Sequence, residues 1–162
     1  SIIEDRSRDI VLYIVGGHSA TERYVASLSA RAPRNVVFTG KVEADQANLY
    51  VNAADVCLLP VNNIRVSPGS PIKLFDYIAA GRPVVAQEGT RGYSDIVLSH
   101  ELGYVIDFHD SCSAAARMLR IVDELREKDF ETHNRQVALN VLSWRNVASQ
   151  WSAFIDKVQR VD

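Results

Sequence analysis

The sequence has few of the features that mark a secreted or a nucleic-acid-binding protein. Only two of its 162 residues are cysteines, and Cys57 lies inside the apolar run ADVCLLP. We therefore expect no disulfide framework and favour a reducing compartment, the cytoplasm. The 18 Lys and Arg residues do not outnumber the 20 Asp and Glu residues. This balance argues against a nucleic-acid partner or a polybasic membrane surface, whereas small anionic ligands remain compatible with it.

Long apolar runs are also missing from the sequence. No stretch approaches the roughly 18 apolar residues that cross a bilayer, and no signal-peptide pattern is present at the start. The 162 residues, 47% of them apolar, suffice for one compact domain with a core but not for two of ordinary size. We expect a single domain over residues 1–162. The first residue is Ser1 rather than Met, which suggests a segment of a longer protein, although removal of an initiator Met explains it equally.

Five apolar segments have the length of β-strands. Their apolar residues are nearly continuous rather than alternating, which is typical of strands covered on both faces. The segments are IVLYIV, NVVFTG, ADVCLLP, PVVA and GYVIDF, at residues 10–15, 35–40, 54–60, 83–86 and 103–108.

Helical patterns lie between these strands. Ser19 and Glu22 have the spacing of a capping box for a helix that ends near Ala30, and residues 44–53 have a shorter pattern. The alternation predicts an α/β fold, a Rossmann-like three-layer domain of about five parallel strands with helices on both faces. Ligands of such sheets bind at the carboxyl ends of the strands.

The last third of the chain predicts a helical tail. Residues 111–128 and 143–161 carry apolar residues at alternating steps of three and four, and residues 130–141 show a weaker pattern. Trp144, Trp151 and Phe154 belong to the apolar stripe of the last helix. We expect these three aromatic side chains to cover the domain's own sheet.

The segment SPGSPIKLFDYIAAGRPVVA, residues 67–86, predicts a well-bounded helix after a loop of small residues. Ser70 fits its N-cap, Pro71 its first position and Gly81 the residue just past its end. The helical spacing places Lys73 and Asp76 on one face. We expect the buried face to consist of Ile72, Phe75, Ile78 and Ala79.

Two hypotheses explain this helix. The N–H groups at a helix start suit phosphate oxygens, Lys73 would add a positive charge, and Asp76 is placed to accept hydrogen bonds from a ribose. A nucleotide diphosphate would satisfy all three. An ordinary capped helix with a solvated Lys73–Asp76 pair explains the same pattern, so both hypotheses stay open.

A second candidate is the glycine pair Gly16 and Gly17 in IVGGHSATE, at the end of the first strand. Glycines there let a ligand approach the backbone, but many strand-to-helix turns need glycine for their own geometry. The fingerprint G-x-G-x-x-G is not matched, and the next strand ends in Thr39 and Gly40 without an acid for a ribose. A nicotinamide dehydrogenase is therefore disfavoured.

Other polar clusters give weaker signals. Asp107, His109 and Asp110 resemble a metal-binding group, but a solvated turn explains them better, so we expect no metal site. His18 lies beside the strand-end glycines, where capping or solvent contact explains it almost as well as ligand binding. No G-x-S-x-G motif occurs, so nucleophilic hydrolysis has no support and the catalytic residues stay unassigned.

Four segments, taken in order, resemble the C-terminal, donor-binding domain of GT-B glycosyltransferases, especially the retaining group called family 4 or group 1. They are LYIVGG, NVVFTGKV, LYVNAADVCLLP and SPIKLFDYIAAGRPVVA, and the closing SWRNVASQWSAFIDKV extends the similarity over nearly the whole chain. The resemblance implies a transferase that moves a sugar from a UDP- or GDP-sugar donor and needs no separate cofactor. It also implies that this chain lacks the N-terminal acceptor domain, through which alone a peripheral membrane contact is expected.

The resemblance also implies which residues contact the donor. The strand-end glycines line the donor cleft, the backbone at Lys41 and Val42 meets the base, and the loop before the helix receives the diphosphate. His18 is counted with these candidates because of its position beside the glycines. Asp76 takes the place of the acid, usually Glu, that binds the nucleotide ribose, and Lys73 is the strongest candidate at the phosphates. The loop and helix-start residues concerned are Ser67, Gly69, Ser70, Ile72 and Lys73.

The chain departs from the family pattern in three places. The acid that faces the donor sugar would fall on Pro68, the opening strand and helix with their basic pair are missing, and the acceptor domain is absent. In the family the last helix packs on that acceptor domain, so exposure of Trp144, Trp151 and Phe154 is the alternative to their covering this sheet. A GT-B nucleotide-sugar epimerase and a non-catalytic nucleotide-binding domain remain alternative functions. The base, sugar, acceptor, stereochemical outcome and oligomeric state are left open.

Overall fold

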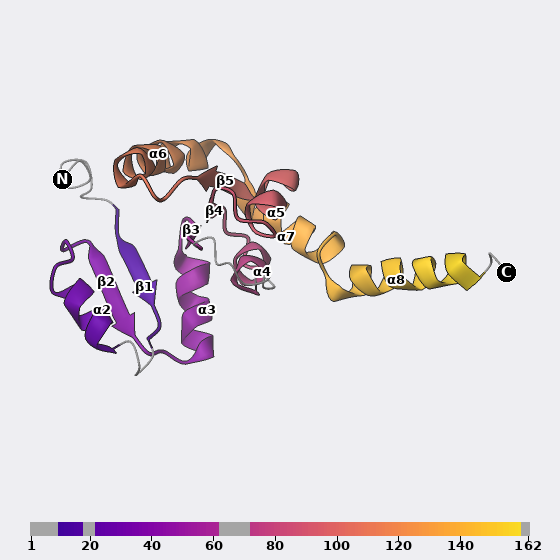
Figure 1. Ribbon diagram of the computed structural model, residues 1–162, viewed down its shortest axis with the longest axis horizontal. Coiled ribbons are helices and arrows are strands. Elements are labelled where there is room, and N and C mark those ends of the chain that lie inside the picture. Colours follow the sequence, from indigo (N-terminus) through magenta and orange to yellow (C-terminus); the bar gives the residue numbers. More distant parts are fainter. Residues whose placement is uncertain (1–9, 18–21, 62–71, 160–162) are drawn as a thin grey trace. The chain divides into compact units, whose positions relative to one another are not determined.

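All five expected strands are present, and they are divided between two parallel sheets (Figure 1). The computed structural model describes residues 10–17, 22–61 and 72–159. Its internal contacts divide the chain into two units, residues 1–54 and residues 55–162, and each is described by itself. We call them unit 1 and unit 2.

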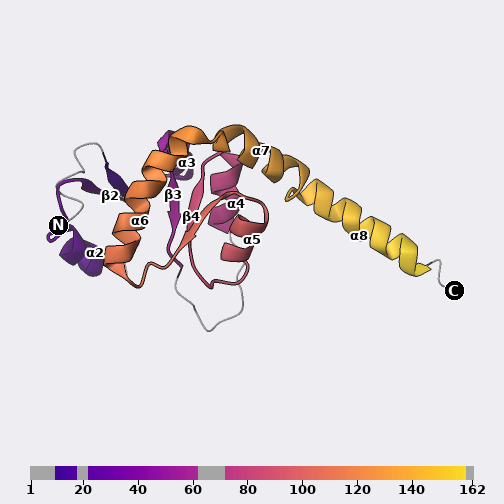
Figure 2. The ribbon, with the colours of Figure 1, turned by 90° about the horizontal axis from the view of Figure 1, so that it is seen from above.

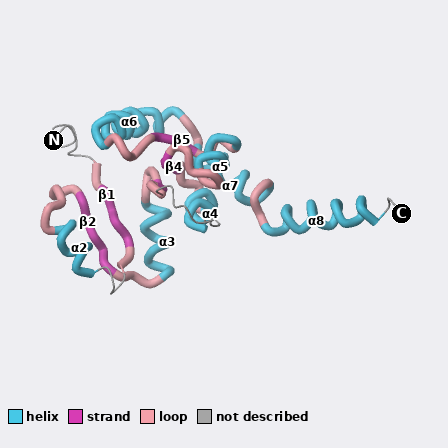
Figure 3. Tube along the Cα trace, in the orientation of Figure 1, coloured by secondary structure: helices cyan, strands magenta, loops and turns pink. Residues whose placement is uncertain are grey.

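Unit 1 is built on a pair of parallel strands. Strand β1 (Leu12–Val15) pairs with β2 (Val36–Gly40), helix α2 (Glu22–Ser29) lies between them in sequence, and α3 (Ala44–Ala53) follows (Figure 3). Glu43 and Gln46 form a capping box that fixes the start of α3 at the expected residue. The Tyr13 ring of β1 lies 5.6 Å from the Tyr50 ring of α3.

The side chains of β1 are exposed, although its continuous apolar run predicts a strand covered on both faces. In unit 1 this strand has β2 on one edge, and helix α2 packs on β2. The apolar run therefore predicts the strand correctly but its burial wrongly.

Unit 2 contains the second sheet, with strand order β3-β4-β5 and all strands parallel. Its strands are β3 (Cys57–Leu59), β4 (Val84–Gln87) and β5 (Gly103–Ile106). Helix α4 (Ile72–Ala79) connects the first two strands, and the short helix α5 (Ser94–Ser99) connects the last two. The sequence patterns did not predict α5.

Helices cover both faces of this sheet (Figure 2). Successive strand residues point to opposite faces, so Val84 of β4 packs with Leu74 of α4 on one side. Its neighbour Val85 packs with Ile121 of α6 (Ser111–Glu124) on the other side. The three-layer arrangement expected from the sequence is thus confirmed.

The buried face of α4 differs from the expected one. Leu74 and Ile78 are completely buried and Phe75 is half-buried, whereas Ile72 is 67% exposed and Ala79 is exposed. Leu74 and Ile78 are four residues apart and therefore share a face, while Ile72, two residues before Leu74, lies about 200° around the axis. The expectation was wrong for Ile72 and Ala79, because the buried stripe of helix α4 runs through Leu74 and Ile78.

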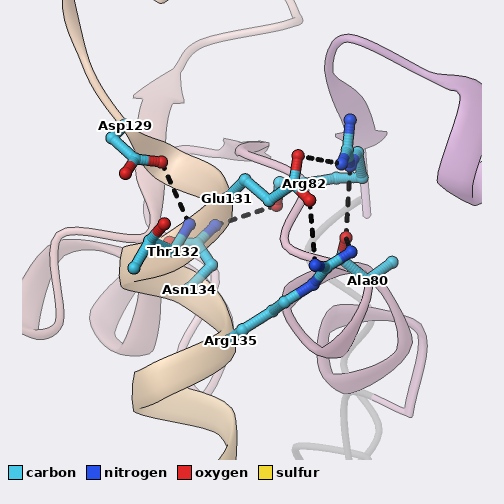
Figure 4. A network of polar contacts seen from close by, with 7 residues as sticks. All are labelled: Ala80, Arg82, Asp129, Glu131, Thr132, Asn134 and Arg135. Carbon is cyan, nitrogen blue, oxygen red and sulfur yellow. Dashed lines mark hydrogen bonds and ion pairs between the residues drawn. The ribbon is translucent and has the colours of Figure 1, made fainter.

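Helix α7 (Phe130–Asn140) closes the amino end of the sheet in unit 2 (Figure 4). The Asn134 amide Nδ2 donates hydrogen bonds to the carbonyl oxygens of Arg82 and Leu102, at 2.9 and 3.1 Å. Arg82 also forms an ion pair with Glu131, at 2.8 Å. Gly81 ends α4 with a positive φ of 78°, and a Cβ there would lie 2.9 Å from the Glu131 carbonyl oxygen. Only glycine fits that contact.

The 3-10 helix η2 (Leu125–Glu127) lies between α6 and α7, and the last helix of the chain is α8 (Trp144–Gln159). Trp144, Trp151 and Phe154 are 86%, 63% and 58% exposed. The expectation that they cover the sheet of this chain was wrong, because no residue of α8 is buried. Over the residues described, no helix is both long and apolar enough to cross a membrane.

Candidate functional site

The glycines after β1 lie against the backbone after β2. Gly16 has a positive φ of 105°, and its N–H donates a hydrogen bond to Thr39 Oγ1 at 3.2 Å. A Cβ on Gly17 would lie 3.3 Å from the Lys41 backbone nitrogen. The carboxyl ends of the two strands therefore bring Gly16, Gly17 and Lys41 together. The side chain of Lys41 is exposed and that of Val42 is half-buried.

The first turn of α4 lies at the carboxyl edge of the sheet in unit 2. Because α4 connects two parallel strands, it runs antiparallel to them, and its start follows the end of β3. Lys73 and Asp76 are both exposed on this helix. In the described part of α4, these two side chains form no ion pair with each other, so neither charge is neutralised by the other.

Several of the expected site residues lie outside the described residues. They are His18 beside the strand-end glycines and Ser67, Gly69 and Ser70 before α4. Pro68, at the position of the family's sugar-facing acid, lies there too. The described candidates are thus Gly16, Gly17, Lys41 and Val42 in unit 1, and Ile72, Lys73 and Asp76 in unit 2.

Two buried polar side chains, Gln87 as the last residue of β4 and Thr90 just beyond it, were missed by sequence reasoning. Gln87 accepts a hydrogen bond from the Phe108 N–H at 2.9 Å and donates one to Asp107 Oδ1 at 3.1 Å. Thr90 donates from its hydroxyl to the Val61 carbonyl oxygen at 3.2 Å. The only signal in the sequence is a polar residue directly after the apolar strand PVVA, which is also the usual start of a loop.

Asp107 and Asp110 act as hydrogen-bond acceptors in the turn before α6. The His109 N–H and then the Gln87 amide lower the pKa of Asp107, and the Ser113 hydroxyl and N–H lower that of Asp110. Asp110 is the N-cap of α6, since its carboxylate accepts the N–H groups of Cys112 and Ser113. Asp107, His109 and Asp110 are all exposed in this turn. Among the residues described, no group of three His, Cys, Asp or Glu side chains is placed to hold a metal ion.

Cys57 is buried in β3, and both cysteines are free thiols. Burial raises the pKa of its thiol to about 11, against a smaller opposite effect of Arg82. The thiol is therefore protonated at neutral pH and packs as an apolar side chain rather than serving as a nucleophile.

Comparison with known proteins gives a consistent result. The family model described as glycosyl transferases group 1 matches residues 1–124. A phosphatidyl-myo-inositol mannosyltransferase of Propionibacterium freudenreichii subsp. shermanii is 30% identical over 128 residues. The match covers 78% of this chain and 32% of that protein, so the chain spans about a third of the length of this curated relative.

Three solved structures are similar in fold. A sucrose-phosphate synthase of Thermosynechococcus elongatus matches with a TM-score of 0.72 and 19% identity, over 99% of this chain and 41% of that one. TarM matches with a TM-score of 0.67 and 17% identity, over 94% and 30%. WaaG, a glycosyltransferase involved in lipopolysaccharide biosynthesis, matches with a TM-score of 0.61 and 24% identity, over 85% and 36%. At these identities the similarity shows the fold alone, and it confirms the Rossmann-like architecture.

Proposed function

Because this chain belongs to the group 1 family of glycosyl transferases, we propose that it binds the donor, a UDP- or GDP-sugar, for transfer of the sugar to an acceptor. The single observation that carries this proposal is the first turn of α4 at the carboxyl edge of the sheet, with Lys73 exposed on it and not paired with Asp76. Ligands of doubly wound sheets bind at this edge, and helix starts suit phosphates.

The proposed chemistry is the stabilisation of a leaving diphosphate. When the bond from sugar to diphosphate breaks, negative charge develops on the phosphate oxygens. Lys73 supplies a positive charge to these oxygens, and the N–H groups of the helix start supply partial charges. Asp76, one turn further on, accepts hydrogen bonds from the ribose. No metal ion is needed for this proposal.

The remaining assignments extend this proposal to the whole protein. We propose that residues 1–162 form one donor-binding domain, that a separate acceptor domain provides the acceptor site, and that the protein acts in the cytoplasm on a glycan or glycolipid. The exposed helix α8 and the 32% coverage of the mannosyltransferase relative support the existence of further protein around this chain.

The experiment that tests the proposal measures the affinity for UDP and GDP by calorimetry in two variants, each of which lacks one basic side chain. Lys73→Ala should weaken binding several-fold, because loss of a charge-assisted contact to phosphate costs about 1.5 kcal/mol or more. Arg82→Ala is the matched control, since Arg82 forms an ion pair with Glu131 at the opposite, amino end of the sheet. Equal and negligible effects of the two variants on binding would refute the assignment.

A further inference from the structure

The first turn of α4 and the loop from β4 to α5 lie at the same edge of the sheet in unit 2. The end of α4 leads through residues 80–83 into the first residue of β4, which places that end of the helix at the amino edge of the sheet. Because α4 packs along β3 and β4, its first turn lies toward the opposite, carboxyl edge. Strand β4 ends at this edge, and the loop to α5 starts there.

Helices α4 and α5 also cover the same face of this sheet. Figure 2 shows them next to each other, and α6 lies on the other face. Phe75 of α4 and Tyr93, the last residue before α5, pack against one core cluster that contains Leu74 and Val97. The loop from β4 to α5 therefore borders the start of α4, and a ligand held at that start also meets the loop.

The backbone of this loop is held by hydrogen bonds on both sides of Arg91. Thr90 is buried, and its carbonyl oxygen accepts the Tyr93 N–H at 3.1 Å. The Gly92 N–H donates to Asp95 Oδ2 at 3.3 Å. Arg91 is therefore presented by a hydrogen-bonded turn at the edge of the sheet.

The guanidinium of Arg91 is available to a ligand. The side chain is exposed, and among the described residues it forms no ion pair or hydrogen bond, although Glu88 and Asp95 are close in sequence. A guanidinium stays protonated at any physiological pH, and its planar fork can bind two phosphate oxygens at once. Lys73 and Arg91 thus present two positive charges along one edge of the sheet.

We propose that Arg91 is a second phosphate-binding residue of the donor site, facing the diphosphate from the loop after β4 while Lys73 faces it from α4. This inference rests on the proposed function, in which a nucleotide diphosphate binds at the first turn of α4. A diphosphate carries more than one negative charge, which a single lysine does not balance. A bidentate arginine also fixes the orientation of the group that it binds, which a lysine does not.

The test measures the affinity of the full chain for UDP or GDP, whichever binds more tightly, by calorimetry. Arg91→Ala should raise the dissociation constant about tenfold, the low end of the range for a lost hydrogen bond to a charged group. Arg91→Lys keeps the charge but loses the planar fork, so it should raise the constant by only about threefold. Arg120→Ala is the matched control and should stay within about twofold, because Arg120 is an exposed arginine of α6, on the other face of the sheet.

Salt provides a second readout, which a merely structural role of Arg91 would not change. The difference in affinity between the unchanged protein and Arg91→Ala should shrink as the salt concentration rises, because salt screens the attraction between exposed charges. A difference that is independent of salt, or equal affinities of Arg91→Ala and Arg120→Ala, would overturn the role of Arg91. If the unchanged protein binds neither UDP nor GDP, the proposed function fails, and the role of Arg91 with it. If Lys73→Ala weakens binding and Arg91→Ala does not, only the role of Arg91 fails.

Discussion

At the scale of single residues, glycine positions give the sharpest stability prediction. Gly103 has a φ of 155°, and a Cβ there would lie 2.1 Å from the Val84 carbonyl oxygen of the neighbouring strand. Gly103→Ala should therefore lower the free energy of unfolding by ~3 kcal/mol or more, since neither strand can move without breaking the sheet. Gly89 has a φ of 71° but open space around it, so Gly89→Ala should cost only about 1 kcal/mol. Urea unfolding of both variants measures the difference.

A second prediction at this scale concerns Asp110 and pH. Hydrogen bonds from Ser113 and Cys112 lower its pKa in the folded state. A carboxyl with a lower pKa when folded stabilises the protein above its unfolded pKa, about 3.9, and this stability is lost as the pH falls through the folded value. Ser113→Ala should raise the pKa of Asp110 toward the ordinary value and reduce the dependence of stability on pH in the acid range. NMR titration of Asp110 tests this, and an unchanged pKa would contradict it.

Single residues also show which parts of the candidate site can be predicted from the sequence alone. Gly16 and Gly17 were chosen from their place after a strand, and the structure gives each a different reason for glycine: Gly16 has a positive φ of 105°, whereas a Cβ on Gly17 would lie 3.3 Å from the Lys41 backbone nitrogen. Thr90 and Gln87 were missed because burial of a polar residue at or beyond the end of a strand depends on contacts 20 or more residues away. No local pattern carries that information. The ligand contacts of Lys73 and Asp76 stay predictions.

At the scale of elements, helix α7 should act as a clamp on the amino end of the sheet. Asn134 is completely buried, and its amide satisfies carbonyl oxygens of two residues. Asn134→Leu leaves both oxygens buried without that donor, so it should lower the free energy of unfolding by about 2 to 4 kcal/mol. Gln136, exposed on the same helix, offers a control: Gln136→Leu should change the free energy of unfolding by less than about 0.5 kcal/mol. Chemical denaturation distinguishes the two.

Helix α8 should behave in the opposite way. None of its residues is buried, so a chain that ends at Ser143 should keep its free energy of unfolding within about 1 kcal/mol of the full chain. The measurement is chemical denaturation followed by circular dichroism. A large loss of stability would mean that α8 packs on this chain in solution.

The elements also explain which sequence predictions succeeded. Strands with continuous apolar runs and helices with clear caps, such as α3 and α6, were placed within a few residues. Helix α5 was missed because its six residues span less than two turns, too few for a periodic pattern to be recognised. The exposure of β1 and α8 could not be predicted, because an apolar pattern shows that a face can be buried but not what covers it.

At the scale of the whole molecule, ligand binding should be visible as increased stability. A ligand that binds only the folded state stabilises it by about 2.7 kcal/mol at a concentration 100 times its dissociation constant. Under the proposed function, UDP or GDP should raise the melting temperature of the chain, and inorganic phosphate at the same concentration should raise it less. A thermal-shift panel measures this. No shift with any nucleotide diphosphate would count against donor binding.

The exposed helix α8 has an optical consequence. Trp144 and Trp151 are the only two tryptophans in the sequence, and both lie on this helix. Indole emission from the native chain should resemble that of tryptophan in water and change little while the core of unit 2 unfolds. Fluorescence would then be nearly blind to denaturation of this chain, yet a blue shift on addition of another protein segment would report directly that α8 has become covered.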